Sequence, residues 1–288
     1  SSIDERLIFI NIDGVNTILS NICTHRGHIV VTCSEDSKLK CKYHGRQFEL
    51  NGKLRSAPGF ENNINFPSDR DHLKIINSIY WNSFIFCSLS SDNTINQTLD
   101  TIKTIVPFYK FDQLNYDKEA STEYTIDANW LLYCENYLEG LHIPFVHSGL
   151  NKDIDTKSYK VTLFENFILQ TAMTKDKDLS FPDRDLDSNE GLYPYAFYFF
   201  IFPNIMINIY SWGSSINIVE PISVSKTRIR YLSLPFKGSK QKFGSGGTLD
   251  TVEIEDQRVV TRVQKGMSSR IYKRGRYSAI HELGVHHF

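Results

Sequence analysis

Two short Cys/His pairs near the start of the chain constrain its fold more than any other feature. Cys23 and His25 are separated by one residue, Cys41 and His44 by two, and fifteen residues lie between the pairs. A thiolate and an imidazole on each of two turns can converge on one metal centre. We therefore expect this part of the chain to fold around a metal.

The composition of the two pairs favours a particular kind of centre. Two thiolates and two imidazoles are the ligand set of a Rieske [2Fe–2S] cluster, in which both histidines bind one iron. Gly27 and Gly45 follow the pairs, where glycine permits positive φ and close backbone approach. The alternative is a structural Cys2His2 zinc site, but zinc modules usually pair Cys with Cys and His with His. The alternating order favours the cluster.

The overall composition limits the possible partners and cellular location of the chain. Lys and Arg (32) nearly balance Asp and Glu (33), so we expect no nucleic acid or anionic membrane as partner. The longest apolar run, 196–210, contains Pro203 and two asparagines and is too short to span a bilayer. Five cysteines are too few for a disulfide scaffold and indicate a reducing, cytoplasmic location. Cys33, Cys87 and Cys134 lack ligand spacing and are interpreted as core residues. The chain opens without Met, so residues upstream of it are expected.

The first 92 residues predict a small all-β domain. Asp13-Gly14 and Asn51-Gly52 are two-residue hairpin turn signals between apolar runs. A polar run, Ser90–Gln97, is interpreted as a linker. The expected strands are residues 7–12, 15–19, 28–32, 38–40, 46–50, 53–54, 75–79 and 84–89.

Residues 93–288 show a different pattern. A helix is expected over 129–142 and an amphipathic helix from Thr251 to about Met267. The segments between them are rich in β-branched and aromatic residues, with strands expected within 159–171, 193–210, 216–220 and 227–234. The sequence therefore predicts an α+β domain with an antiparallel sheet and helices against it.

A second group of candidate ligands lies in the first of these helices. Glu135, Glu139 and His142 are spaced i, i+4 and i+7, one polar line on a helix that is otherwise apolar nearly all round. Pro144 disfavours helical geometry at the residue before it, so the helix should break there and let His147 approach His142. Taken alone, these histidines could equally be two satisfied core residues.

Asp256 favours the metal interpretation. It falls on the apolar stripe of the second helix, beside Val259 and Val260, where a carboxylate needs a positive partner. Glu253 and Glu255 are interpreted as solvated or capping residues. Two histidines and one carboxylate with open positions are the facial triad of non-haem Fe(II) oxygenases.

The two groups together resemble the α subunits of Rieske non-haem iron oxygenases, also called aromatic-ring-hydroxylating oxygenases. The segments that carry the resemblance are CTHRG at 23–27, CKYHG at 41–45, ENYLEGLHIPFVH at 135–147 and ED at 255–256. The family often has Pro and Trp where this chain has Lys42 and Arg46, a departure that touches no ligand. The resemblance covers nearly the whole chain.

The resemblance implies a Rieske [2Fe–2S] domain over 1–92 and a helix-grip-like catalytic domain over 93–288 that holds a mononuclear iron. It assigns His142, His147 and Asp256 to that iron. Glu139 matches the acidic residue that links the iron of one subunit to the Rieske site of another, through the residue matching His44. Asn136 and Glu135 are candidates for orienting the ligands.

The implied activity is hydroxylation of a small organic substrate with O2 as co-substrate. Electrons would come from NAD(P)H through a separate reductase or ferredoxin, because the chain has no G-x-G-x-x-G fingerprint, and the implied assembly is a homotrimer. The implied substrate is an aromatic ring or a small amine or alkyl group. Glutamate at position 139 is similar to enzymes of the choline and carnitine monooxygenase type, which favours a small quaternary amine among these. Residues 195–212 are expected to contribute to the substrate pocket.

Two other interpretations remain open at this point. Monooxygenation and dioxygenation use the same metals, and the sequence does not separate them. A Rieske electron carrier without its own oxygenase activity would need the first group of ligands but not the second.

Overall fold

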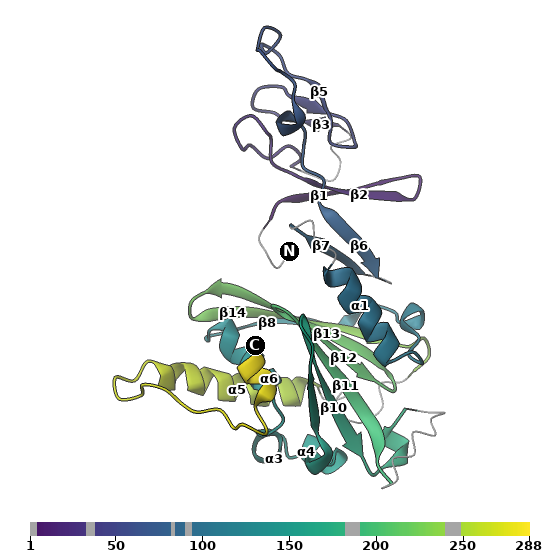
Figure 1. Cartoon of the computed structure of the whole chain (residues 1–288), viewed down its shortest axis with the longest axis vertical. Coiled ribbons are helices and arrows are strands. Elements are labelled where there is room, and N and C mark those ends of the chain that lie inside the picture. Colours follow the sequence, from purple (N-terminus) through teal and green to yellow (C-terminus); the bar gives the residue numbers. More distant parts are fainter. Residues whose placement is uncertain (1–4, 33–37, 82–83, 90–93, 182–190, 240–248) are drawn as a thin grey trace. The chain divides into compact units, whose positions relative to one another are not determined.

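The computed structural model describes residues 5–32, 38–81, 84–89, 94–181, 191–239 and 249–288. The chain divides into two compact units, Ile3–Asn96 and Gln97–Phe288, apart from its first two residues. Each unit has its own hydrophobic core and is described by itself (Figure 1).

The first unit opens with an antiparallel hairpin of β1 (Leu7–Ile12) and β2 (Val15–Ser20). Its two turn residues both have positive φ, 49° at Asp13 and 83° at Gly14. Positive φ at both positions is what a type I′ turn requires, and the Asp-Gly sequence supplies it. The predicted hairpin is confirmed.

The rest of the first unit consists of short strands joined by long turns. They form a three-stranded sheet in the order β3-β4-β5 and a separate hairpin of β6 with β7. The predicted strand at 28–32 is wrong: the described part of this segment makes one isolated bridge, between Ile22 and Ile29. The chain there turns back towards Cys23 instead of pairing along its length. The bounds are β3 (Leu39–Lys40), β4 (Gln47–Phe48), β5 (Leu54–Ser56), β6 (Asn77–Trp81) and β7 (Phe84–Ser88).

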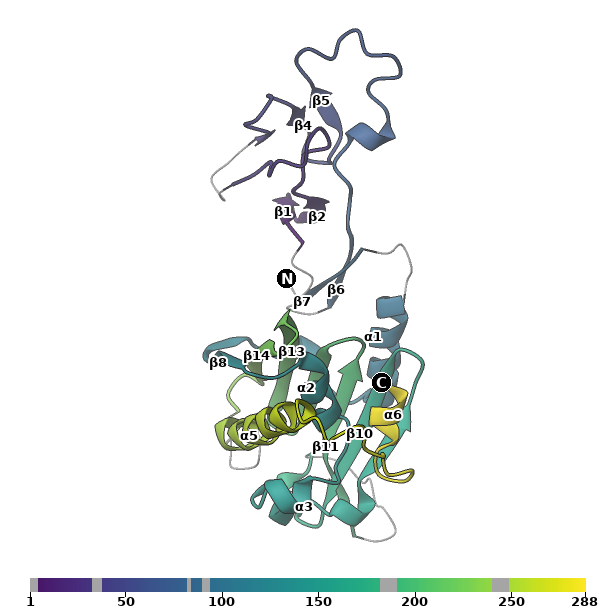
Figure 2. The same cartoon turned by 90° about the vertical axis from the view of Figure 1, so that its left-hand side faces the viewer.

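The second unit is built on a seven-stranded antiparallel sheet in the order β8-β14-β13-β12-β11-β10-β9, so the predicted α+β class is confirmed (Figures 1 and 2). The strands are β8 (Asp117–Ile126), β9 (Lys160–Leu163), β10 (Phe167–Thr174), β11 (Tyr193–Ile201), β12 (Ile205–Tyr210), β13 (Gly213–Ser223) and β14 (Lys226–Pro235). The helices are α1 (Thr94–Ile105), α2 (Trp130–Tyr137), α3 (Ile143–Val146), α4 (Leu150–Asp153), α5 (Leu249–Met267) and α6 (Leu283–His287). The 3-10 turns of this unit are Phe111–Gln113, Thr156–Ser158 and Lys177–Leu179, and the first unit has one at Asp69–Asp71.

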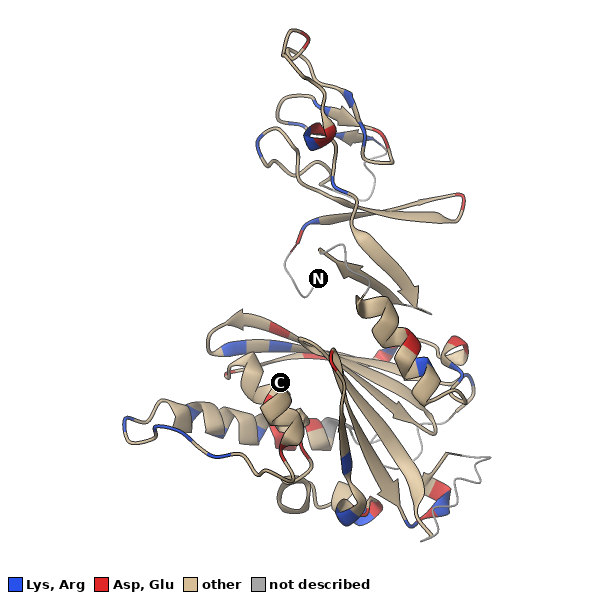
Figure 3. Ribbon diagram, viewed as in Figure 1, with Lys and Arg blue, Asp and Glu red and all other residues tan. Residues whose placement is uncertain are grey.

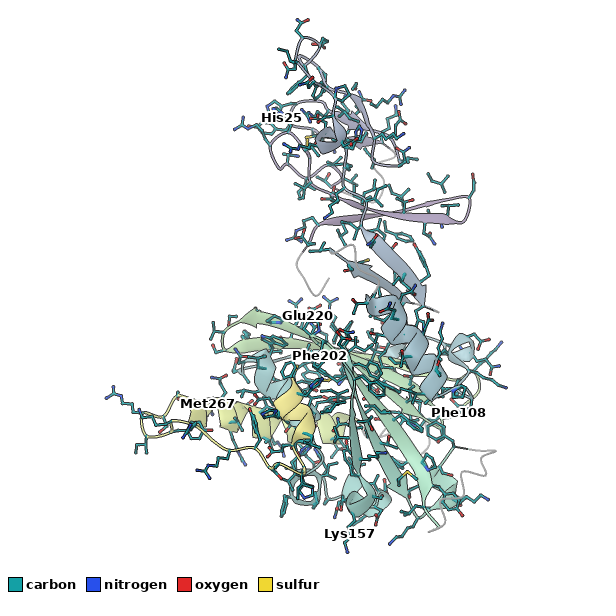
Figure 4. The ribbon with its side chains drawn as sticks, viewed as in Figure 1. His25, Phe108, Lys157, Phe202, Glu220 and Met267 are labelled. Carbon is teal, nitrogen blue, oxygen red and sulfur yellow. The ribbon has the colours of Figure 1, made fainter. Side chains whose placement is uncertain are left out.

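The central strands of this sheet carry aromatic side chains on both faces. On β11, Phe197 contacts Phe108 on one face, while Phe200 contacts Phe288 on the other. Phe202, just after β11, stacks on Phe288, and Figure 4 labels both Phe108 and Phe202. The face with Phe200 is covered by α2, α5 and α6, and this side holds the candidate site.

Two predicted boundaries in this part of the chain are wrong. Residues 94–97, expected in a linker, form the start of α1. The helix expected over 129–142 ends as α2 at Tyr137, and Leu138 is its C-cap. Pro144 does not end this helix; it lies in the first turn of the separate helix α3, where its missing N–H costs nothing.

The predicted burial of individual residues is only partly confirmed. Val260 of α5 is buried as predicted, but Val263 and Met267 are 43% and 50% exposed, so the apolar stripe does not extend to the end of the helix. Cys134 is buried as predicted, whereas Cys87 is exposed, and Cys33 lies outside the described residues.

None of the described helices is both long and apolar enough to cross a membrane.

Candidate metal sites

The two cysteine turns of the first unit have the same backbone design. Gly27 N–H donates to the carbonyl of Cys23 at 3.0 Å, and Gly45 N–H donates to that of Cys41 at 3.0 Å. Both glycines have positive φ, 69° and 78°, as the sequence predicted. Each turn is closed by a further bond from the cysteine N–H, to His28 O and to Arg46 O respectively, both at 2.8 Å.

This design brings the four predicted ligands together. Cys23 and Cys41 are 3% and 1% exposed, and their thiols interact with each other. The rings of His25 and His44 lie edge to face with their centroids 4.5 Å apart. Figure 4 labels His25 in the first unit.

The donor set fits a [2Fe–2S] cluster. Nδ1 of His25 is buried and has no hydrogen-bond partner among the described residues. Burial first, then the charges of His44 and Arg46, lower the pKa of His25, which favours the neutral ring with one nitrogen free to act as a ligand. A buried ring nitrogen without a partner calls for an explanation, and a bound metal provides one.

In the second unit, His142, His147 and Asp256 converge. Their ligand atoms all lie within 4.8 Å of one another. Nε2 of His147 lies 3.2 Å from Nε2 of His142 and 3.0 Å from Oδ1 of Asp256, and the remaining distance, His142 Nε2 to Asp256 Oδ1, is 3.7 Å.

Two further carboxylates hold the outer nitrogens of these histidines. Nδ1 of His142 lies 2.5 Å from Oε1 of Glu139, and Nδ1 of His147 lies 2.8 Å from Oε2 of Glu255. A carboxylate accepts a hydrogen bond, so each Nδ1 suits the hydrogen of its ring, and this would leave each Nε2 available to a metal. Two lone pairs and a carboxylate oxygen meeting at one point fit a divalent cation there.

The carboxylates also act on the pKa of His147. Burial alone would lower it, but Asp256 and then Glu255 raise the pKa above its usual value. The interpretation of Glu255 as a solvated or capping residue is therefore wrong: its carboxylate orients a candidate ligand.

The backbone after α2 positions Glu139 and His142. The prediction that they share one helical line with Glu135 is wrong, because both follow the end of the helix. Gly140 occupies this bend, where a Cβ would come within 2.9 Å of the Tyr159 ring. Glu139 then accepts bonds from the backbone N–H groups of Leu141 and His142.

Asn136 and Glu135 take different positions. Asn136 Nδ2 donates to Oδ1 of Asp256 at 2.7 Å, which is the orienting contact expected of it. Glu135 instead accepts a bond from Tyr277 OH at 3.1 Å, and no contact with the three candidate ligands is seen for it in the described part of the chain.

Glu253 is the second acidic residue whose role the sequence did not reveal. Its carboxylate accepts bonds from Tyr133 OH at 2.5 Å, from Asn217 Nδ2 at 2.9 Å and from Tyr124 OH. Burial raises the pKa of Glu253, Asp256 adds to this, and the tyrosine and asparagine donors oppose it. Glu253 is thus neither solvated nor a simple cap.

A cavity of about 90 Å³ lies beside the three candidate ligands. Three of its lining residues, Tyr198, Asn208 and Tyr210, come from the 195–212 segment that was expected to contribute. The other lining residues include tyrosines 133, 137 and 159, together with Glu139, Glu253 and Gln170. Figure 3 shows acidic residues in the first half of α5 and basic residues towards its far end.

Comparisons with known proteins support this arrangement. Residues 111–288 match the family described as "Ring hydroxylating alpha subunit (catalytic domain)", and residues 2–74 match the Rieske [2Fe-2S] domain. These matches imply a [2Fe–2S] cluster and a mononuclear iron. A Rieske electron carrier would not need the catalytic domain that residues 111–288 match.

Among curated relatives, the chain is 29% identical to a chloroplastic choline monooxygenase of Arabidopsis thaliana over 284 residues, covering 93% of this chain and 66% of the relative. It is 27% identical to the carnitine monooxygenase oxygenase subunit of Escherichia coli K12 over 297 residues, covering 96% and 76%. The chain thus spans about two thirds of the Arabidopsis relative, and 61% of the Amaranthus tricolor choline monooxygenase.

Two solved structures show the shared fold. The quaternary ammonium Rieske monooxygenase CntA with γ-butyrobetaine has a TM-score of 0.68 at 20% identity, covering 98% of this chain and 78% of CntA. Naphthalene 1,2-dioxygenase from Rhodococcus sp. has a TM-score of 0.64 at 18% identity, covering 94% and 76%. With the match over 111–288, the chain belongs to the ring-hydroxylating α-subunit family, and a Rieske [2Fe–2S] domain precedes its catalytic domain.

Proposed function

We propose that this chain is the oxygenase component of a Rieske monooxygenase that hydroxylates a small organic cation. The observation that carries the proposal is the lining of the cavity beside His142. Tyrosine rings and three carboxylates line it, and no Lys or Arg does among the described residues. Such a lining suits a positively charged substrate and disfavours an anionic one.

The metal ligands are proposed as follows. Cys23, His25, Cys41 and His44 hold the cluster, and His142, His147 and Asp256 hold the mononuclear iron. When both groups are bound, they supply the electrons and the oxygen activation that hydroxylation of a C–H bond requires.

The chain's own residues prepare the site for this chemistry. Glu139 and Glu255 keep the hydrogen of each imidazole on Nδ1, so both Nε2 atoms stay available as ligands. Asn136 fixes the orientation of Asp256 through its 2.7 Å bond. These contacts hold the ligand atoms in place before any metal arrives, which limits the reorganisation that binding requires.

The aromatic lining supports an ammonium or alkylammonium substrate. A cation over the face of a tyrosine ring is stabilised by about 0.5–2 kcal/mol, more where water is excluded. Glu253 adds a partly buried carboxylate to the same cavity. The relatives named as choline and carnitine monooxygenases act on such cations by their names.

We further propose that a separate reductase or ferredoxin supplies the electrons and that the chain works as a homotrimer. In this assembly His44 of one copy would meet Glu139 of the next. Glu139 already bonds Nδ1 of His142, so it would connect the two metal sites through hydrogen bonds.

A cytoplasmic location stays a prediction.

The proposed activity predicts incorporation of one oxygen atom from O2 into a small N-methylated cation. The experiment supplies the iron-loaded protein with a reductase, NADH and 18O2, and follows products of choline, carnitine and naphthalene by mass spectrometry. One labelled oxygen in the product of a cation is expected. A cis-dihydroxylated naphthalene product with no turnover of either cation would contradict the proposal.

Replacing Asp256 with Ala should abolish binding of the mononuclear iron. The two imidazoles that remain are too few to hold the ion, whereas the cluster lies in the other unit and keeps its ligands. Total iron should fall by about one ion per chain while the visible spectrum of the cluster is unchanged. Asp112→Ala, an exposed aspartate of the same unit, serves as the control; full iron content in Asp256→Ala would refute the ligand assignment.

Replacing Glu253 with Gln should raise the KM for a cationic substrate roughly tenfold, since a charge contact of about 1–2 kcal/mol is lost. The pKa of Glu253 is raised, so its charge is present above that pKa and is lost as the pH falls through it. The KM of the parent protein should therefore rise at lower pH, and that of Glu253→Gln should not follow. The exposed Glu119→Gln is the matched control; a pH profile equal to that of the parent in Glu253→Gln would exclude the role.

Replacing Glu139 with Gln tests whether electrons pass between the subunits of a trimer through this residue. The amide oxygen of Gln still accepts a hydrogen bond from His142, but it lacks the negative charge of the carboxylate. Both metals should therefore stay bound, while reoxidation of the reduced cluster by O2 and substrate slows at least tenfold. Stopped-flow absorbance measures this rate, and sedimentation measures the mass. A monomer with full parent activity would contradict the assembly.

A further inference from the structure

Arg46 is a buried cation next to the cluster turns. Its side chain is 4% exposed, although it directly follows the His44-Gly45 turn. Its Nη1 donates to Oγ1 of Thr24 at 3.1 Å, and Thr24 lies between Cys23 and His25. The guanidinium thus touches one ligand turn while its own backbone carbonyl closes the other, through the bond from Cys41 N–H.

Aromatic rings surround this charge. The guanidinium carbon lies 4.6 Å from the centroid of Phe60 and 5.2 Å from that of Phe66. Phe60 in turn packs edge to face on His25, with centroids 5.1 Å apart. Rings and burial exclude water, so the field of Arg46 is screened less than that of a surface charge.

Among the described residues, the positive charge of Arg46 is paired with a single carboxylate. Asp71 is the carboxylate paired with it, by one contact of 3.3 Å from Nη1 to Oδ1. Burial would raise the pKa of Asp71, but bonds from Ser68 and the charge of Arg46 lower it, so the carboxylate is ionised at neutral pH. Nε of Arg46 is buried and has no partner among the described residues. The guanidinium itself contacts Thr24, between Cys23 and His25, so its positive charge lies directly against this ligand turn.

We propose that Arg46 raises the reduction potential of the cluster held by these turns. Reduction adds one electron from the donor protein to the cluster, so the charge of the cluster and its ligands falls by one. A nearby buried cation stabilises that added negative charge and favours the reduced form.

This proposal rests on the proposed cluster ligation but not on the proposed substrate. A structural role for Arg46 alone, as a brace between Thr24 and Asp71, would affect cluster content and thermal stability without a systematic change in potential. Reduction potential and cluster content are therefore measured separately on each variant of the full chain, by a redox titration followed by EPR and by iron and visible absorbance.

Arg46→Gln should lower the equilibrium constant for reduction about tenfold, a shift of 59 mV for a one-electron couple. Arg46→Lys keeps the charge and should stay near the parent potential. Asp71→Asn removes the compensating carboxylate and should move the potential in the opposite direction. Arg26→Gln is the matched control, because Arg26 also lies beside the cluster ligands but is exposed, and its loss should change the potential less.

A parent-like potential in Arg46→Gln with full cluster content would overturn the proposal, as would an equal shift in Arg26→Gln. If Arg46→Gln fails to hold its cluster, Asp71→Asn decides. A higher potential in that variant supports the inference, and an unchanged or lower potential refutes it.

Discussion

The site of the second unit depends on two imidazoles that are each held at Nδ1 by a carboxylate. Glu139 and Glu255 hold Nδ1 of His142 and His147, and the two Nε2 atoms face each other at 3.2 Å beside Asp256. Without a cation this meeting of lone pairs and a carboxylate would be unfavourable. The surrounding elements resist separation of these groups: α2 and α5 pack together, and the bend at Gly140 is closed against Tyr159. Preorganisation of this kind explains why a small, largely antiparallel scaffold can hold a metal with only three ligands.

Much of this could be predicted from the sequence, because ligand spacing is a local property. The turns around Cys23 and Cys41 follow from Cys, His and Gly at fixed short separations, and the structure reproduces both. The convergence of His142 and His147 was also expected, although for the wrong reason. The chain bends after Leu138, at a place where Gly140 fits against Tyr159, and a ring 19 residues further along the chain leaves no local signal. Pro144 begins a helix rather than ending one.

The acids on α5 show what periodicity alone misses. Only Asp256 was recognised, because it falls beside Val259 and Val260. Glu253 lies seven residues before Val260, hence on nearly the same helical face, and that spacing could have indicated its burial. Its partners Tyr124 and Asn217 come from two strands of the sheet, so no window of sequence contains them. Glu255 reaches His147 from a partly buried position that a hydrophobic pattern does not mark.

The charges of this site point to the nature of the substrate. Glu139 and Glu255 are hydrogen-bonded by His142 and His147 beside the proposed metal site, and Asp256 would bind the metal that the family implies. Glu253 differs, since its partners in the described chain are two hydroxyls and an amide, none of which carries a positive charge. A buried carboxylate in that situation either takes up a proton or attracts a cation. Because Glu253 lines the same cavity as the tyrosine rings, the cationic substrate proposed above would supply this compensation, and its binding would favour the ionised carboxylate.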